Sequence, residues 1–349
     1  MLHSKNTIAI PPGETIREQL ADRGMLQKEF AVRMDMSEKH ISNLINGEVR
    51  LAPDVALRLE SVLGIPASFW NNLEANYREK LARIKDELVL ERDEEIARKM
   101  PYARITKLNW VPTAKTLMEK VRNLRGFFEV SSLGLLGNLR TPGIAYRKIG
   151  ENETSDYSLA CWAQKAKLEA RKISVEPVNM KRLEESIPEI RSLTVQSPEF
   201  FCDRLRSILT ECGIALVFLP HIGGSFLHGA SFPDGKRIVV GITVRGKDAD
   251  KFWFSLLHEL GHVIKGHVFS NDSDIKEQER NANTFAQNVL IPEEKFNRFT
   301  SRANIQRKDI VSFANEIGIA SGIVLGRLQK EGCVRYDQHA DLKQQYVIG

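Results

Sequence analysis

Two histidines and a glutamate interrupt the apolar run FSLLHELGHVI at residues 254–264. Residues four apart on a helix share one face, so His258 and His262 project side by side and can both bind one tetrahedral metal ion. Glu259 is rotated from His258 by about 100°, beside the ion, where it can take a proton from an activated water. Since unpaired buried His and Glu are costly, the alternatives are this metal site or two core histidines satisfied by backbone carbonyls.

A third ligand would decide between these alternatives, and Glu279 is the best candidate. It lies within an apolar stripe at helical spacing, formed by Ile275, Ala282, Ala286, Val289 and Leu290. A carboxylate in a core-facing row needs a strong partner, whereas Glu277 and Arg280 point away from the stripe. Asn283, one turn later, can hydrogen-bond a ligand from outside the coordination shell. The alternative is an ordinary helix whose Glu279 reaches solvent or pairs with a lysine.

Two histidines, one glutamate and an open fourth position are typical of a catalytic rather than a structural zinc site. The metzincin arrangement is excluded, because Lys265 and Val268 stand where its glycine and histidine belong. We expect His267 in the turn that ends the helix. His228, in SFLHGASF, is either a second catalytic residue that helps an oxyanion or a plain loop histidine. The strand expected at 237–244, RIVVGITV, is a candidate edge for aligning an extended peptide.

These segments also resemble a known family. HELGH, QERNANTFAQNVLIP and FANEIGIASGIVLGRLQKEG are similar in order to the ImmA/IrrE metallopeptidases, over roughly residues 210–335. The resemblance implies Zn²⁺ as cofactor, with His258, His262 and Glu279 as its ligands and Glu259 as the catalytic base. The sequence departs from the family at Asn281, where many relatives carry a second acidic or amide residue. That position faces away from the stripe.

The other end of the chain, LQKEFAVRMDMSEKHISNLINGE and its surroundings, resembles the Xre-type helix-turn-helix of HigA-like antitoxins over roughly residues 10–80. We expect short helices at 14–23, 27–34, 38–45 and 53–63. Ser37 stands at an N-cap, Asp35 replaces the usual turn glycine, and Gly47 stands at a C-cap. The small core is expected to contain Ala31, Ile41, Leu44 and Leu57.

The resemblance makes 37–45 the recognition helix of this module. The DNA contacts that it implies are Gln27 on a phosphate, with Ser37, Glu38, Lys39, Ser42 and Asn43 at the start of the recognition helix. Residues 1–67 hold 8 Lys and Arg against 9 Asp and Glu, a net charge of −1 (8 − 9), whereas a basic patch is expected of a DNA-binding domain. Protein interaction or dimerisation is therefore the alternative role.

The bulk composition predicts a globular protein of two or three domains: 349 residues, 42% hydrophobic, with a net charge of +5 that neither demands nor excludes an anionic partner. We expect an α+β, predominantly α fold. It comprises a helix-turn-helix domain at 1–80, a charged helical linker at 81–105 and a helical middle region at 106–200. A zincin-like metallopeptidase domain follows at 201–349, with a small β-sheet packed on the HExxH helix.

The four cysteines form no CxxC pair, and we expect them to be reduced thiols. The sequence shows no signal peptide and no run near the roughly 20 apolar residues that span a bilayer. We therefore expect a cytoplasmic protein that does not enter a membrane.

Three functions fit the motifs. The first is a zinc endopeptidase with a fused operator-binding domain, cleaving an Xre-type repressor or antitoxin in stress, toxin–antitoxin or mobile-element control. The second is an Xre-type transcription regulator whose peptidase-like domain senses a metal or ligand without cleavage. The third is a toxin–antitoxin component that binds a toxin through its middle region. Glu259 favours the first, because a sensor does not need the base. The habits of helix-turn-helix proteins predict a homodimer.

Overall fold

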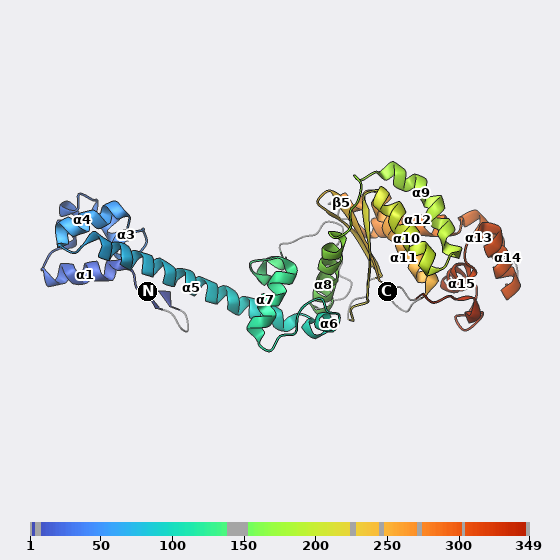
Figure 1. Ribbon diagram of the computed structural model, residues 1–349, viewed down its shortest axis with the longest axis horizontal. Coiled ribbons are helices and arrows are strands. Elements are labelled where there is room, and N and C mark those ends of the chain that lie inside the picture. The colour runs from blue at the N-terminus through green and yellow to red at the C-terminus, as the bar shows by residue number, and fades with distance from the viewer. Residues whose placement is uncertain are drawn as a thin grey trace. The chain divides into compact units, whose positions relative to one another are not determined.

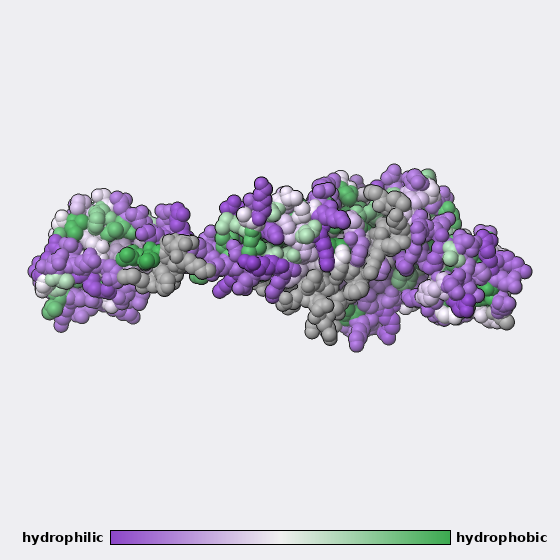
Figure 2. All heavy atoms as spheres, turned by 90° about the horizontal axis from the view of Figure 1, so that it is seen from below, coloured by the Kyte–Doolittle hydropathy of each residue, from purple (hydrophilic) through white to green (hydrophobic). Residues whose placement is uncertain are grey.

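The computed structural model describes residues 2–3, 8–137, 153–223, 228–243, 248–270, 274–301 and 304–346. The chain forms two compact units, Met1–Glu95 and Ile96–Gly349 (Figure 1). The fold is α+β and predominantly α, as the sequence predicts. Figure 2 shows that the visible surface of each unit is mostly hydrophilic, with scattered hydrophobic patches.

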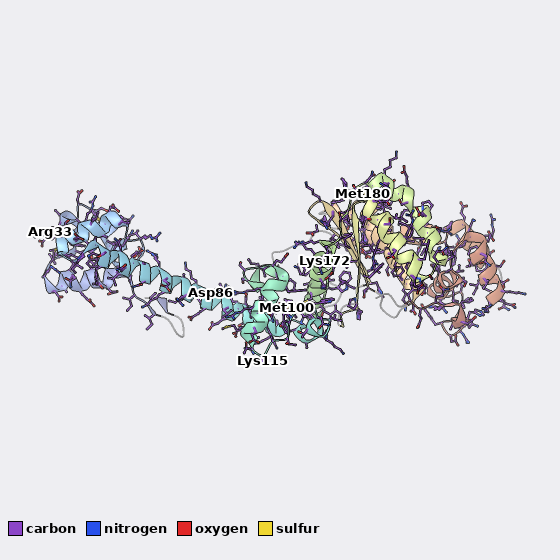
Figure 3. The ribbon with its side chains drawn as sticks, viewed as in Figure 1. Arg33, Asp86, Met100, Lys115, Lys172 and Met180 are labelled. Atoms are coloured by element: carbon purple, nitrogen blue, oxygen red, sulfur yellow. The ribbon has the colours of Figure 1, made fainter. Side chains whose placement is uncertain are left out.

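The first unit packs short helices around one apolar core. The helices are α1 (Pro12–Asp22), α2 (Gln27–Arg33), α3 (Glu38–Ile45), α4 (Pro53–Leu63) and the first part of α5 (Ala67–Lys99). The first four agree with the expected ranges to within two residues. An antiparallel pair, β1 (Leu2–His3) and β2 (Ile8–Ala9), precedes them. Arg33, labelled in Figure 3, lies on the outside of this unit, where it forms an ion pair of 2.7 Å with Glu29.

The caps and turns of the first unit also follow the sequence. The backbone N–H of His40 donates to Ser37 Oγ at 3.2 Å, so Ser37 caps α3. Asp35 adopts the left-handed conformation, with φ 52°, that a turn glycine would otherwise supply. The core prediction is wrong for Leu57, which is 60% exposed. The buried face of α4 is formed by Val55, Ala56, Leu59 and Leu63, and Leu57 faces away from it.

The second unit begins in the last turn of α5 and continues with helices. These are α6 (Tyr102–Lys107), α7 (Leu117–Phe128), η1 (Leu133–Gly137), α8 (Glu153–Ala170), α9 (Met180–Ser192), η2 (Leu193–Val195) and α10 (Pro198–Glu211). The middle region is thus mainly helical, as expected. It belongs to the same compact unit as the sheet, because Trp162 of α8 packs directly against Gly241 in the central strand.

A three-stranded sheet follows, formed by β3 (Ile214–Leu219), β4 (Gly229–Asp234) and β5 (Arg237–Thr243). The strand order is β3-β5-β4, with β3 parallel and β4 antiparallel to β5. The prediction that β5 is an edge strand is therefore wrong, since it is paired on both sides. In the described sheet the edges are β3 and β4. Val244, the last residue of the expected strand, lies outside the described residues.

The remaining elements build the core beside the sheet. They are α11 (Ala249–Ile264), η3 (His267–Phe269), α12 (Ile275–Leu290), α13 (Glu293–Thr300), α14 (Arg307–Ile317), α15 (Ser321–Lys330) and η4 (Ala340–Leu342). Gly229 in β4 faces Glu259 of α11, and its register partner Ile242 points to the same side. Because neighbouring residues of a strand point to opposite faces, α11 covers one face of the sheet and α8 the other. Among the described residues no single helix is long and apolar enough to cross a membrane, and α14 and α15 meet that test only together, across a bend of 116°.

A candidate metal centre between α11 and α12

The helix α11 is buried because it is apolar on nearly every side. Trp253, Leu256, Leu257 and Leu260 are fully enclosed, which fixes the rotation of the helix about its axis. A glycine at 261 lets α12 approach closely, since a Cβ there would lie 3.3 Å from the Cα of Ala282. The polar residues of the two helices are thereby brought face to face.

The structure brings together the three side chains that the sequence singled out. The Nε2 atoms of His258 and His262 are 3.1 Å apart. Glu279 places its Oε2 atom 3.4 Å from His258 Nε2 and its Oε1 atom 3.3 Å from His262 Nε2. All donor atoms lie within 4.8 Å of one another. A tetrahedral ion with bonds of about 2.0–2.1 Å has ligands about 3.3–3.4 Å apart, so this donor set fits zinc.

A second layer of contacts orients both imidazoles. His258 Nδ1 lies 3.0 Å from the side-chain oxygen of Asn283, as the sequence predicts for that residue. An amide oxygen only accepts, so Nδ1 carries the hydrogen and the lone pair of Nε2 points to the centre. On the other side, His262 Nδ1 lies 3.0 Å from His267 Nδ1. When His267 Nδ1 accepts the hydrogen of His262 Nδ1, both ligand histidines carry their hydrogen on Nδ1 and present the lone pair of Nε2 to the metal.

The contact of His267 was missed by sequence reasoning, although its place in the turn after α11 is confirmed. Gly266 adopts φ 73° and reverses the chain, which returns His267 to the helix face that carries His262. A glycine directly followed by histidine at the end of the HExxH helix is the signal that could have indicated this contact.

Glu259 lies under β4, an element that the sequence did not predict. Its side chain is nearly buried, at 7% exposed, and accepts a hydrogen bond of 2.8 Å from Ser231 Oγ. Gly229 leaves room for it, because a Cβ at that position would lie 2.9 Å from Glu259 Cγ. Ser231 and Gly229 are thus two further residues of the site. Ser231 binds, and Gly229 makes room for, a carboxylate that is not among the three converging donors.

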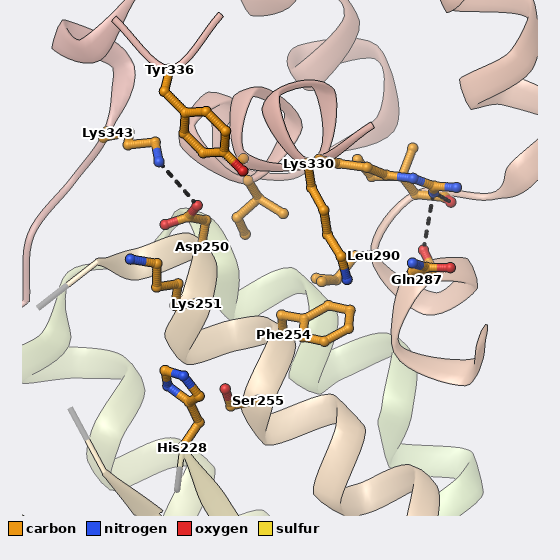
Figure 4. Close-up of a pocket in the computed structure, with 14 residues that line it drawn as sticks. His228, Asp250, Lys251, Phe254, Ser255, Gln287, Leu290, Lys330, Tyr336 and Lys343 are labelled. Atoms are coloured by element: carbon orange, nitrogen blue, oxygen red, sulfur yellow. Dashed lines mark hydrogen bonds and ion pairs between the residues drawn. The ribbon is translucent and has the colours of Figure 1, made fainter. Parts of the chain in front are cut away.

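His228 lies elsewhere in the same region. It is exposed and lines a cavity wall beside Ser255 and Lys251 of α11 (Figure 4). Its backbone oxygen accepts from the N–H of Thr243 at 2.9 Å, which ties it to the β4–β5 ladder. It is not one of the three clustered donors. A role for His228 with an oxyanion remains a prediction.

The predicted DNA-contact residues share the solvent-facing start of two helices. Gln27 is the first residue of α2, and Ser37 is the N-cap of α3. Glu38 and Lys39 are exposed, and Ser42 and Asn43 are half-buried on the following turn. None of the six side chains is buried, and all six belong to α2 or to α3 with its N-cap. Side chains that contact DNA must be accessible in this way.

Comparisons with known proteins match both units. A peptidase family described as the IrrE N-terminal-like domain matches residues 213–329, and a helix-turn-helix family matches residues 16–70. The chain is a helix-turn-helix protein with a fused IrrE-like domain. An uncharacterised HTH-type transcriptional regulator of Escherichia coli, YddM, is 33% identical over 63 residues, which is 18% of this chain and 67% of that protein. An addiction module antidote protein of the HigA family from Coxiella burnetii is 29% identical, with a TM-score of 0.23, covering 24% of this chain and 94% of the other.

Proposed function

We propose that the IrrE-like domain is a zinc-dependent endopeptidase that cleaves a regulatory protein. The observation that carries the proposal is the convergence of His258, His262 and Glu279 at distances suited to a tetrahedral ion. A repressor or antitoxin of the Xre type is the substrate class that we favour, in stress, toxin–antitoxin or mobile-element control. The fused helix-turn-helix domain would bring the peptidase to regulators that use the same operators.

The residues of the chain divide the chemistry between them. A bound zinc ion would supply a Lewis acid for the attacking water and for the scissile carbonyl. Glu259 accepts the proton of the attacking water and returns it to the leaving amine. Ser231 holds one oxygen of that carboxylate at 2.8 Å, so the general base is oriented before the substrate arrives. Asn283 keeps His258 in the ligand tautomer, and His267 would do the same for His262 by accepting a hydrogen bond from its Nδ1 atom.

The substrate is proposed to bind as an extended strand along β4. This strand is an edge of the described sheet, and it carries the two residues that contact Glu259. Main-chain hydrogen bonds to an open edge align a peptide without reading its sequence. We therefore propose that β4, and not β5 as the sequence suggested, aligns the extended peptide.

Metal content tests the proposal first. Elemental analysis of purified protein is expected to find about one zinc per chain, with none in the His262→Ala variant. Wild type and Glu259→Gln are then co-expressed with Xre-type proteins encoded nearby, and cleavage is followed by mass spectrometry. We expect both proteins to hold zinc and only the wild type to cleave. Zinc-free folded protein, or equal cleavage by both, would refute peptidase action. Zinc without cleavage by either would favour the regulator that senses metal.

We also propose that α3 of the first unit binds operator DNA. The support is the exposed first turn of α3 and the similarity to YddM, whose name describes a transcriptional regulator. A mobility-shift assay on the protein's own promoter tests it with Asn43→Ala and Lys39→Ala. Lys80→Ala, an exposed lysine outside the matched segment 16–70, is the control. Weaker binding by the first two variants alone is expected, and equal binding by all three contradicts the assignment.

A further inference from the structure

A cavity of about 290 Å³ lies beside the candidate metal centre, between α11, α12 and α15 (Figure 4). Its walls continue the faces that carry the metal donors. Phe254 precedes His258 by one turn of α11, and Gln287 follows Asn283 by one turn of α12. One helical turn advances about 5.4 Å, so a peptide whose backbone reaches the donors can place a neighbouring side chain in this cavity.

Most charges around the cavity are already paired. Lys251 forms an ion pair of 2.6 Å with Asp248. Lys343 lies 3.5 Å from Asp250, which Gly326 allows to approach α15. These two pairs are locally neutral. They do not give the cavity a preference for either charge.

Two positive charges remain after this pairing. Arg327 donates to the carbonyl oxygen of Ile291 at 2.6 Å and lies 4.0 Å over the ring of Phe296. Burial lowers the pKa of its guanidinium more than the nearby carboxylates of Glu331 and Glu293 raise it, and its Nε atom has no hydrogen-bond partner. Lys330 places its ammonium nitrogen 4.7 Å from the ring centroid of Phe254. Within the described part of the chain, neither cation forms an ion pair with a carboxylate.

We propose that this cavity receives a glutamate side chain of the protein substrate, next to the cleaved bond, and that Lys330 and Arg327 recognise its carboxylate. The apolar stem would pack on Phe254 and Leu290, which line the cavity. Pockets for drug-sized ligands hold about 300–1,000 Å³, so a cavity of about 290 Å³, just below this range, suits one side chain better than a cofactor. The inference rests on the proposed peptidase function.

Cleavage specificity gives the first test. A peptide library derived from a bacterial proteome is digested with the zinc-loaded full chain, and residues flanking the cleaved bonds are counted by mass spectrometry. We expect glutamate to be preferred over glutamine by about tenfold at one position, the value of one charge-assisted hydrogen bond. Lys330→Glu should abolish the preference, because the introduced carboxylate offsets the charge of Arg327. Lys308→Glu, the same charge change at an exposed lysine outside the cavity, should keep it.

A binding measurement separates this inference from the proposed function. Saturation-transfer NMR compares N-acetylglutamate N-methylamide with its glutamine counterpart, and needs neither metal nor turnover. The glutamate compound should bind about tenfold better than the glutamine compound to wild type and to Lys308→Met. Lys330→Met should bind the two compounds equally poorly. Selective binding in a protein that cleaves nothing would refute the peptidase and support the cavity. Cleavage without acid preference, or no selective binding, would overturn the cavity assignment.

Discussion

Replacing Asn283 by alanine tests whether the contacts behind the histidines tune the metal centre. The substitution removes the 3.0 Å hydrogen bond to His258 Nδ1 and leaves the three proposed ligands in place. Hydrogen bonds that involve a charged or polarised group contribute about 1.5–3 kcal/mol, and 1.4 kcal/mol corresponds to about a tenfold change in affinity. Because the side chain of His258 is only 14% exposed, water replaces the lost contact poorly. We expect zinc affinity to fall by about 10–100-fold, as is typical of such residues.

Competition with a fluorescent zinc chelator measures this affinity in the full chain. Asn288→Ala is the matched control, because Asn288 is exposed on the same helix. Circular dichroism of the metal-free proteins shows whether either variant has lost helix. Equal affinities for the two folded variants would refute the claim that Asn283 fixes the tautomer of His258.

Three further predictions concern other parts of the chain. Gly229→Ala should lower kcat on any cleaved protein while zinc affinity is unchanged, because its Cβ would lie 2.9 Å from the Cγ of Glu259, which is not a ligand. Ser37→Ala should destabilise α3 by about 1 kcal/mol, seen as faster hydrogen exchange across residues 38–46. Burial raises the pKa of Cys161 to about 12, so its thiol stays protonated below that pH. Iodoacetamide at pH 8 should therefore label exposed Cys333 and leave native Cys161 intact, as peptide mass mapping would show.

The three converging donors could be predicted because helical periodicity alone decides which side chains share a face. His258 and His262 are one turn apart, and Glu279 interrupts a stripe whose members Ala282 and Ala286 are buried. The same reasoning placed Asn283 correctly, since it follows Glu279 by one turn. Local spacing was sufficient for these residues because each lies on a long regular helix.

The rest of the site depends on contacts that no local pattern encodes. The segment of β4, GASFPD, contains glycine and proline and lacks the alternation of β-branched residues that indicates a strand. It is a strand because it pairs with β5, as in the register of Ser231 with Val240. Without β4, sequence reasoning treated β5 as an edge and found no partner for Glu259. The contact of His267 with His262 was missed for a similar reason, since it depends on the left-handed turn at Gly266.

The surroundings of Glu259 bear on the choice between a peptidase and a metal sensor. Binding an ion needs only the three donors, so a sensor places no demand on residue 259. Here that residue is a carboxylate at 7% exposure, and burying its charge is unfavourable unless hydrogen bonds compensate. Ser231 supplies such a bond from a different element, and Gly229 leaves space where any larger residue would collide. Two positions of β4 are thus fitted around a group that metal binding does not use, whereas proton transfer at a peptide bond requires it.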